Sequence, residues 1–276
     1  MSAPIEVGPW KSAPFALGSE TVFAIGDVHG CANELTALLE TVAKLAPESG
    51  GLRRLVYLGD MVDRGPDTAG VLRLWAEGPL VRGVDRIDRI IGNHEIMMLL
   101  TMADSPHAGK ARAMWLADGT GGNKVLEQMR RLVGDPRAQP SYELAAEALG
   151  EDVMRLLMTQ RGYLRVGNAL FVHGGLDGKT DRAVFLSTPW TAFSGARWAW
   201  ITHGFLDWQG GFGGTLVVHG HAPPAKHWPL THMEDPHLFL YDRLGLDGGS
   251  AVTGFVVGAE IRDGRYRILK AGQPRP

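Results

Sequence analysis

The feature that most constrains the fold is a regular alternation of short apolar runs and amphipathic segments in the first hundred residues. Strands are expected at 21–25, 55–58 and 88–91, and glycine followed by Asp or Asn comes directly after each of them. Helices are expected at 34–45, 67–77 and 95–102, where apolar side chains recur at helical spacing. Strands that alternate with helices form βαβ units and a largely parallel sheet, whose carboxyl edge is where ligands bind. The sequence therefore predicts an α/β fold.

The strand signal disappears between 103 and 162. Helices are expected there at 110–116, 124–132 and 142–160, so the stretch is predicted to be a helical insertion that borders the site and shapes substrate access. Strands are expected again at 163–166, 169–172, 215–218, 237–241, 251–261 and 266–269. Their density in the last third predicts a second sheet packed on the first, within a single domain of residues 1–276.

Composition excludes several classes of protein. The 28 Lys and Arg against 30 Asp and Glu give a formal net charge of −2, which lacks the basic footprint of a non-specific nucleic-acid binder. The one cysteine, Cys31, excludes an intrachain disulfide framework and fits a reducing compartment. The first 19 residues lack a basic region and an apolar run, and no stretch approaches 18 apolar residues. We therefore expect a soluble cytoplasmic protein with no nucleic-acid or membrane partner.

Five glycine-containing turns carry side chains that could bind metal ions. Each follows or ends an apolar strand, and they are 26–30 (GDVHG), 59–65 (GDMVDRG), 92–95 (GNHE), 172–175 (VHGG) and 219–221 (HGH). Gathered at one sheet edge, they would combine oxygen and nitrogen donors, which suits Mn, Fe or Zn better than a thiolate site or an all-oxygen cage. A lone Gly-Asp turn indicates little, but Asp27, Asp60 and Asn93 follow one another at equal intervals of 33 residues.

In this order the motifs resemble those of the phosphoprotein phosphatase family of metallophosphoesterases, the serine/threonine phosphatase type, and in particular its bacterial branch. The resemblance runs from Gly26 to Gly258 and includes the segment 243–250 (RLGLDGGS). It implies a four-layer αββα sandwich with a two-metal centre between the sheets, in agreement with the two sheets expected above.

The resemblance also implies a ligand set for two divalent transition-metal ions, Mn foremost, with Fe or Zn as alternatives. The first metal would be bound by Asp27 and His29, and Asp60 would bridge both. The second would be completed by Asn93, His173 and His221. A hydroxide bridging such a pair would attack phosphorus in line, because bound metals lower the pKa of water towards about 7.

Three further residues would act on the substrate by the same resemblance. His94 would be the general acid that protonates the leaving alkoxide, and Asp63 would orient it. Arg64 would bind the phosphate with its bidentate guanidinium. Asn93 is placed among the substrate-binding residues as well.

The chain departs from the family pattern at a second phosphate-binding arginine. Bacterial members carry it in a Trp-x-Arg segment, whereas the corresponding stretch 198–205 (WAWITHGF) has no arginine. Arg197 or His203 could substitute. His219 competes with His221 for the ligand role, and the family pattern, which puts the ligand after the glycine, favours His221.

These observations predict a metal-dependent phosphoester hydrolase, foremost a protein serine/threonine phosphatase acting on a phosphorylated protein or a small phosphoester. The nearest alternative is a symmetrical diadenosine tetraphosphatase, which shares most of these loops. Such enzymes usually lack the Asp before the arginine of the second motif and end the third motif in Asp, so Asp63 and Glu95 favour the phosphatase branch. A non-catalytic scaffold on the same fold is a remote alternative, because such proteins lose the general-acid histidine or metal ligands.

Overall fold

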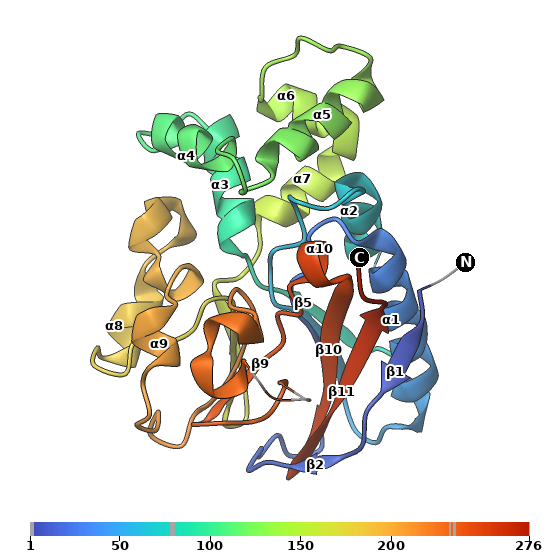
Figure 1. Cartoon of the computed structure of the whole chain (residues 1–276), viewed down its shortest axis with the longest axis vertical. Coiled ribbons are helices and arrows are strands. Elements are labelled where there is room, and N and C mark those ends of the chain that lie inside the picture. The colour runs from blue at the N-terminus through green and yellow to red at the C-terminus, as the bar shows by residue number, and fades with distance from the viewer. Residues whose placement is uncertain (1–2, 78–80, 232, 234–235, 276) are drawn as a thin grey trace.

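Two β-sheets pack face to face in the computed structural model, which describes residues 3–77, 81–231, 233 and 236–275 (Figure 1). Among these residues the first sheet has the strand order β1-β11-β10-β3-β4-β5, and β2 pairs with β11. Its strands are β1 (Ile5–Val7), β2 (Lys11–Ser12), β3 (Thr21–Ile25), β4 (Arg53–Tyr57), β5 (Arg86–Arg89), β10 (Phe255–Arg262) and β11 (Arg265–Gly272). Only β3, β4 and β5 run parallel to one another.

The second sheet has the order β6-β7-β8-β9. Its strands are β6 (Tyr163–Val166), β7 (Ala169–Val172), β8 (Leu216–His219) and β9 (Arg243–Gly245), of which the last three are parallel. Two layers of apolar side chains explain why buried strands such as β3 and β7 are almost entirely apolar. In β3, Val22 and Ala24 face the core between the sheets, while Phe23 and Ile25 face the core under the helices. Both faces of each sheet are therefore covered.

Helices cover the outer faces of the two sheets. On the first sheet, α1 (Ala32–Leu45) packs on β10 and β11, and α2 (Thr68–Ala76) packs on α1. Beside the second sheet lie α8 (Arg182–Ser187) and α9 (His203–Leu206) (Figure 1). The αββα layering expected from the sequence is confirmed. None of the helices in the described ranges is long and apolar enough to cross a bilayer.

After α3 (Asn93–Met102), four more helices precede the second sheet along the described chain. They are α4 (Ala108–Trp115), α5 (Gly122–Val133), α6 (Tyr142–Leu149) and α7 (Glu151–Met158). They form a group beyond the carboxyl edge of the sheets (Figure 1) and pack on α2 and on α3 (Asn93–Met102). The single helix expected at 142–160 is wrong, because Gly150 adopts φ +100° and interrupts it. That the whole chain is one domain stays a prediction.

The C-terminal strands show where local pattern failed. The strand expected at 237–241 is wrong, because Tyr241 and Asp242 take left-handed backbone conformations and β9 begins only at Arg243. The strand expected at 251–261 begins at Phe255, since residues Ser250–Thr253 form the short helix α10. Strands 21–25, 163–166 and 169–172 have the bounds that were expected.

Candidate metal centre and active site

The five glycine-containing turns meet at the carboxyl edge of the two sheets, as expected. They follow or end β3, β4, β5, β7 and β8. Two glycines explain why the loops can approach so closely. A Cβ on Gly220 would lie 2.1 Å from Asp27 Oδ1, and one on Gly92 would lie 2.2 Å from Asp60 Oδ1. The sequence therefore needs glycine at both places to bring ligand-bearing loops into contact.

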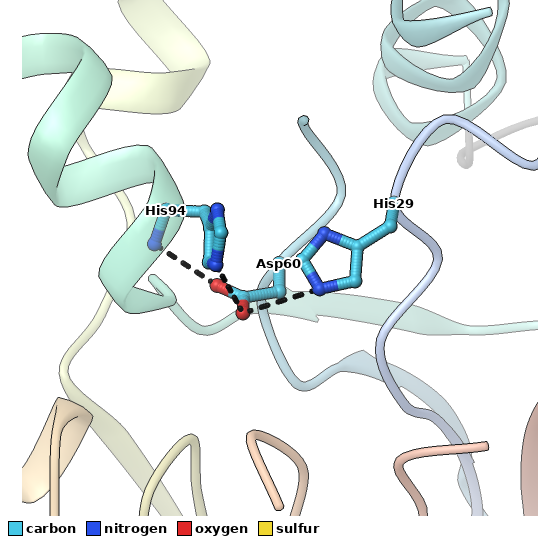
Figure 2. Close-up of side chains that lie close together, drawn as sticks. All are labelled: His29, Asp60 and His94. Atoms are coloured by element: carbon cyan, nitrogen blue, oxygen red, sulfur yellow. Dashed lines mark hydrogen bonds and ion pairs between the residues drawn. The ribbon is translucent and has the colours of Figure 1, made fainter. Parts of the chain in front are cut away.

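Asp60 stands at the centre of two groups of side chains that could each hold a metal ion. One group is His29, Asp60 and His94, and the other is Asp60, His173 and His221. Figure 2 shows His29 and His94 on opposite sides of the Asp60 carboxylate. Oδ2 of Asp60 lies 3.6 Å from His29 Nε2 and 3.8 Å from His94 Nε2, while Oδ1 lies 3.3 Å from His173 Nε2.

The remaining two expected ligands border these groups. Oδ2 of Asp27 lies 4.0 Å from His29 Nε2, and the carboxylate accepts the backbone N–H of His221 at 3.0 Å. Oδ1 of Asn93 lies 2.8 Å from His221 Nδ1 and 3.0 Å from His173 Nε2. All six residues expected as ligands are therefore brought together, and five of them are buried.

The donor set fits divalent cations. Nδ1 of His173 donates to the Leu58 carbonyl at 2.8 Å, so a neutral ring directs the Nε2 lone pair at oxygens of Asp60 and Asn93. Facing lone pairs need a positive charge between them, from a proton or a metal ion. Although burial lowers the pKa of His173, the charge of Asp60 and the hydrogen bond to it raise the pKa to about 10. A cation is thus favoured at this place.

The imidazoles of His29 and His221 remain neutral, which metal binding requires. Burial, followed by the charge of His173, lowers the pKa of His221 to about 3. Burial and the charge of His94 also lower the pKa of His29, whose Nδ1 donates to the Val62 carbonyl at 2.7 Å. Burial by itself would raise the pKa of Asp60, but the charges of His173 and His94 lower it well below its usual value. Asp60 is therefore ionised between the two groups.

A hydrogen-bonded pair adjoins the ligands. His94 Nδ1 donates to Oδ2 of Asp63 at 2.6 Å, and both side chains are buried. The guanidinium of Arg64 faces the same space, with Nη1 2.7 Å from His29 Nε2 and Nη2 2.9 Å from His94 Nε2. Two side chains therefore lie beside the candidate metal groups. One is the acid–base imidazole of His94, which Asp63 orients, and the other is the planar guanidinium of Arg64.

The site is built from backbone conformations that ordinary residues rarely adopt. φ is +55° at Asp60, +72° at Asp63 and +62° at Arg64, and His29 and His221 are also left-handed. Each such residue costs about 1–3 kcal/mol, and such strain clusters at functional sites. Glu95 holds the loop: its carboxylate accepts the backbone N–H groups of Asp60, Met61, Val62 and Gly92 at 2.7–3.1 Å. The sequence had marked Glu95 only as a difference between related families.

The two proposed substitutes for the missing arginine have other partners. Arg197 Nη2 pairs with Asp177 at 3.1 Å, and its guanidinium lies over the Phe185 ring. The side chain of His203 is 84% exposed and lies 3.8 Å from Asp207. None of the contacts found in the described ranges ties either residue to the six candidate ligands. The expectation that one of them binds phosphate therefore has no support from the site geometry.

Sequence reasoning missed Lys226 and Trp115. Lys226 ends the 3-10 turn Pro224–Lys226 just after His221, and its charge adds to the burial that lowers the pKa of His94 and His221. The indole of Trp115 donates to Oδ1 of Asp63 at 2.9 Å. His219 lies outside both candidate groups, with Nδ1 2.9 Å from the Gly220 carbonyl. For Lys226, the one signal in the sequence is that a lysine follows soon after the ligand motif of His221.

Comparison with known proteins gives a consistent family and fold. Residues 20–244 match the sequence profile described as calcineurin-like phosphoesterase. Curated relatives include the symmetrical bis(5′-nucleosyl)-tetraphosphatases of Janthinobacterium sp. (strain Marseille) and Yersinia pestis (strain Pestoides F). The first is 36% identical over 91 residues, 32% of this chain and 30% of that protein. The second is 31% identical over 144 residues, 51% of this chain and 42% of that protein. The match thus spans less than half of either relative.

Two solved structures share the fold. One, provisionally called a diadenosine tetraphosphatase, has a TM-score of 0.50 at 19% identity and covers 94% of this chain and 96% of that chain. The other is a mutant of a cold-active protein tyrosine phosphatase, with a TM-score of 0.53 at 17% identity, covering 91% of this chain and 78% of that chain. At these identities the two structures support the architecture alone.

Proposed function

Because this chain belongs to the calcineurin-like phosphoesterase family, we propose that it is a metal-dependent phosphoester hydrolase whose substrate is a dinucleoside polyphosphate. The observation that carries the hydrolase is the pair of ligand groups joined at Asp60, beside Arg64 and the His94–Asp63 pair. The substrate class rests on the curated relatives, which are symmetrical bis(5′-nucleosyl)-tetraphosphatases. They favour the alternative of the sequence analysis over a protein phosphatase.

The metal-binding residues proposed are Asp27, His29, Asp60, Asn93, His173 and His221. Two divalent cations bound there would supply positive charge for the phosphoryl oxygens and lower the pKa of a water molecule towards about 7. Mixed oxygen and nitrogen donors suit Mn, with Fe or Zn as alternatives. Two of the six ligands carry a negative charge, so a net positive charge remains to attract a polyphosphate.

The protein's own side chains have distinct proposed roles. The guanidinium of Arg64, whose Nη1 and Nη2 lie against His29 and His94, would turn to bind two oxygens of one phosphate. Once protonated at Nε2, His94 would give that proton to the leaving oxygen, while its Nδ1–H stays on Asp63. Lys226 is the second cation near the substrate, in the place that the sequence analysis gave to Arg197 or His203. Symmetrical cleavage of a dinucleoside tetraphosphate would then release two nucleoside diphosphates.

A protein serine/threonine phosphatase is the second candidate, and the His94–Asp63 hydrogen bond favours it. A serine alkoxide is a much poorer leaving group than a nucleoside diphosphate, so an oriented general acid contributes more to its departure. This substrate would be a phosphorylated protein rather than a small dinucleotide. The cytoplasmic location and the absence of a nucleic-acid partner expected from the sequence stay predictions.

A substrate panel tests the proposal. Purified protein is assayed with Mn, Zn or Mg on diadenosine tetraphosphate, phosphoserine peptide, phosphotyrosine peptide and 4-nitrophenyl phosphate. Nucleoside diphosphate and phosphate are quantified by chromatography. The proposal expects metal-dependent release of ADP with the highest kcat/KM of the panel. Higher kcat/KM on phosphoserine peptide would replace the first candidate by the second, and inactivity on all four would contradict both.

A further inference from the structure

The loop between Gly59 and Gly65 is held by contacts with the inserted helices as well as by hydrogen bonds to Glu95. Lys124 Nζ of α5 donates to the Arg64 carbonyl at 2.8 Å. Gln128, one helical turn further on, accepts the backbone N–H of Thr68 at 2.8 Å. A Cβ on Gly121, which precedes α5, would lie only 2.3 Å from the backbone nitrogen of Arg64. The insertion therefore lies directly against the backbone that carries Asp63 and Arg64.

Trp115, the last residue of α4, reaches one functional side chain directly. Its Nε1–H donates to Oδ1 of Asp63 at 2.9 Å, while Oδ2 of the same carboxylate lies 2.6 Å from His94 Nδ1. Trp115 and Asp63 are both fully buried. Each oxygen of the carboxylate thus has its own partner, so rotation of the Asp63 carboxylate about its terminal torsion would break both bonds.

Tight packing fixes the indole itself. A Cβ on Gly122 would lie 2.6 Å from Trp115 Nε1, which shows that the helix α5 begins directly against the ring edge. Hydrogen bonds to a buried carboxylate are shorter and stronger than neutral ones. An indole held in this way is suited to setting the direction of the carboxylate, and through it the plane of the His94 ring.

We propose that Trp115 is a positioning residue of the active site, which acts through Asp63 to hold His94 in the orientation of a proton donor. This inference rests on the proposed function, because it assigns His94 to protonation of the leaving oxygen. The helical insertion is then part of the machinery that orients the general acid, in addition to any effect on substrate access. Trp115 itself touches neither substrate nor metal.

The test compares two matched substitutions. Trp115→Phe removes the indole N–H that bonds to Asp63. Trp75→Phe removes an equally buried indole whose Nε1 has no hydrogen-bond partner in the described part of the chain. Both variants lose the same atoms from a packed core, but Trp115→Phe also leaves Oδ1 of Asp63 without its donor, so its loss in thermal unfolding should be the larger of the two. A purely structural role for Trp115 predicts that any loss of activity is independent of the leaving group.

The kinetic measurement uses a series of aryl phosphates with progressively poorer leaving groups. We expect Trp115→Phe to lower kcat by about 10–100-fold with little change in KM, as seen when residues that orient an active-site side chain are removed. The loss should grow as the leaving group becomes poorer, because protonation then contributes more to the barrier. Trp75→Phe should stay within about twofold of the wild type on every substrate.

Two further readouts complete the test. In ¹⁵N-labelled protein, the indole N–H signal that Trp115→Phe removes should shift in Asp63→Asn, and the Trp75 signal should not. In the Asp63→Asn background, Trp115→Phe should cause little additional loss of kcat. Losses independent of the leaving group, or equal to those of Trp75→Phe, contradict this assignment alone. A wild type inactive on every aryl phosphate and on diadenosine tetraphosphate contradicts the proposed function and the assignment with it.

Discussion

Oε2 of Glu95 accepts the backbone N–H of Asp60 at 2.8 Å, so the third motif holds the second in its left-handed conformation. The same carboxylate takes three more backbone N–H groups, from Met61, Val62 and Gly92. Glu95 is fully buried, and within the described ranges these four donors are its hydrogen-bond partners and no ion pair involves it. A carboxylate thereby ties the ends of β4 and β5 together under the candidate metal centre.

Replacing Glu95 by Gln should destabilise the protein strongly. The amide nitrogen would face backbone donors, so at least one buried N–H would lose its acceptor, at a cost of about 2–3 kcal/mol. Urea unfolding measures the difference, with Glu147→Gln as the control because that side chain is exposed on α6. Equal midpoints for the two variants would show that the four hydrogen bonds contribute little.

Lys226 should contribute to substrate binding. Removing its charge in Lys226→Met should raise KM for diadenosine tetraphosphate by about 3–10-fold and leave kcat nearly unchanged, as expected for a contact equally strong in ground and transition states. The increase should shrink at high salt, because exposed charges are screened. Arg197→Met, which removes an ion pair with Asp177, is the comparison. A larger effect of Arg197→Met would restore the role that the sequence analysis gave it.

Metal content should distinguish the two neighbouring histidines. The structure places His221 in a candidate metal group and His219 outside both. After loading with Mn and dialysis, elemental analysis should give two equivalents for the wild type and for His219→Asn, and about one for His221→Asn. Loss of metal from His219→Asn with retention in His221→Asn would reverse the assignment.

Acid should destabilise the metal-free protein through His219. Burial lowers its pKa to about 3, and its ring meets Phe205 edge to face with centroids 4.9 Å apart. An unfolded chain binds the proton near pH 6.5, so the unfolded state gains protons between pH 7 and 5 while the folded His219 stays neutral. Stability then falls as the pH falls, by about 2 kcal/mol from this group.

The measurement is urea unfolding in the presence of a chelator at pH 7 and pH 5. His219→Gln should lose about 2 kcal/mol less than the wild type between the two values. An equal loss in both proteins would mean that His219 is protonated, or solvated, in the folded state.

Local sequence pattern was sufficient to predict the buried apolar strands and the edge of the sheet at which their loops meet. The apolar run 21–25 became β3 with the bounds expected, and the ligand turns met because parallel strands end at a common edge. It failed where distant contacts decide. Pairing with β11 makes a strand of the exposed residues Ile5–Val7. At Gly150 the reason is local: its φ of +100° breaks a helix although the apolar periodicity continues on both sides.

Trp115 shows the same limit within the site. It lies 52 residues from Asp63, and along α4 it reads as an ordinary apolar residue of a helix. Nothing in its neighbours indicates that the indole meets a carboxylate. The role expected of Arg197 stays a prediction: its position beside the expected motif fits, whereas its guanidinium pairs with Asp177 and lies over Phe185.

The central claim, that Asp60 joins two metal ions in a hydrolytic site, is tested most directly by one comparison. Mn-dependent hydrolysis of 4-nitrophenyl phosphate is measured for the wild type and for Asp60→Asn, with bound Mn determined in the same samples. The account predicts two equivalents of Mn and chelator-sensitive turnover for the wild type, and loss of both metal and at least about 100-fold of kcat/KM for Asp60→Asn. Equal metal content and equal turnover in the two proteins would contradict it.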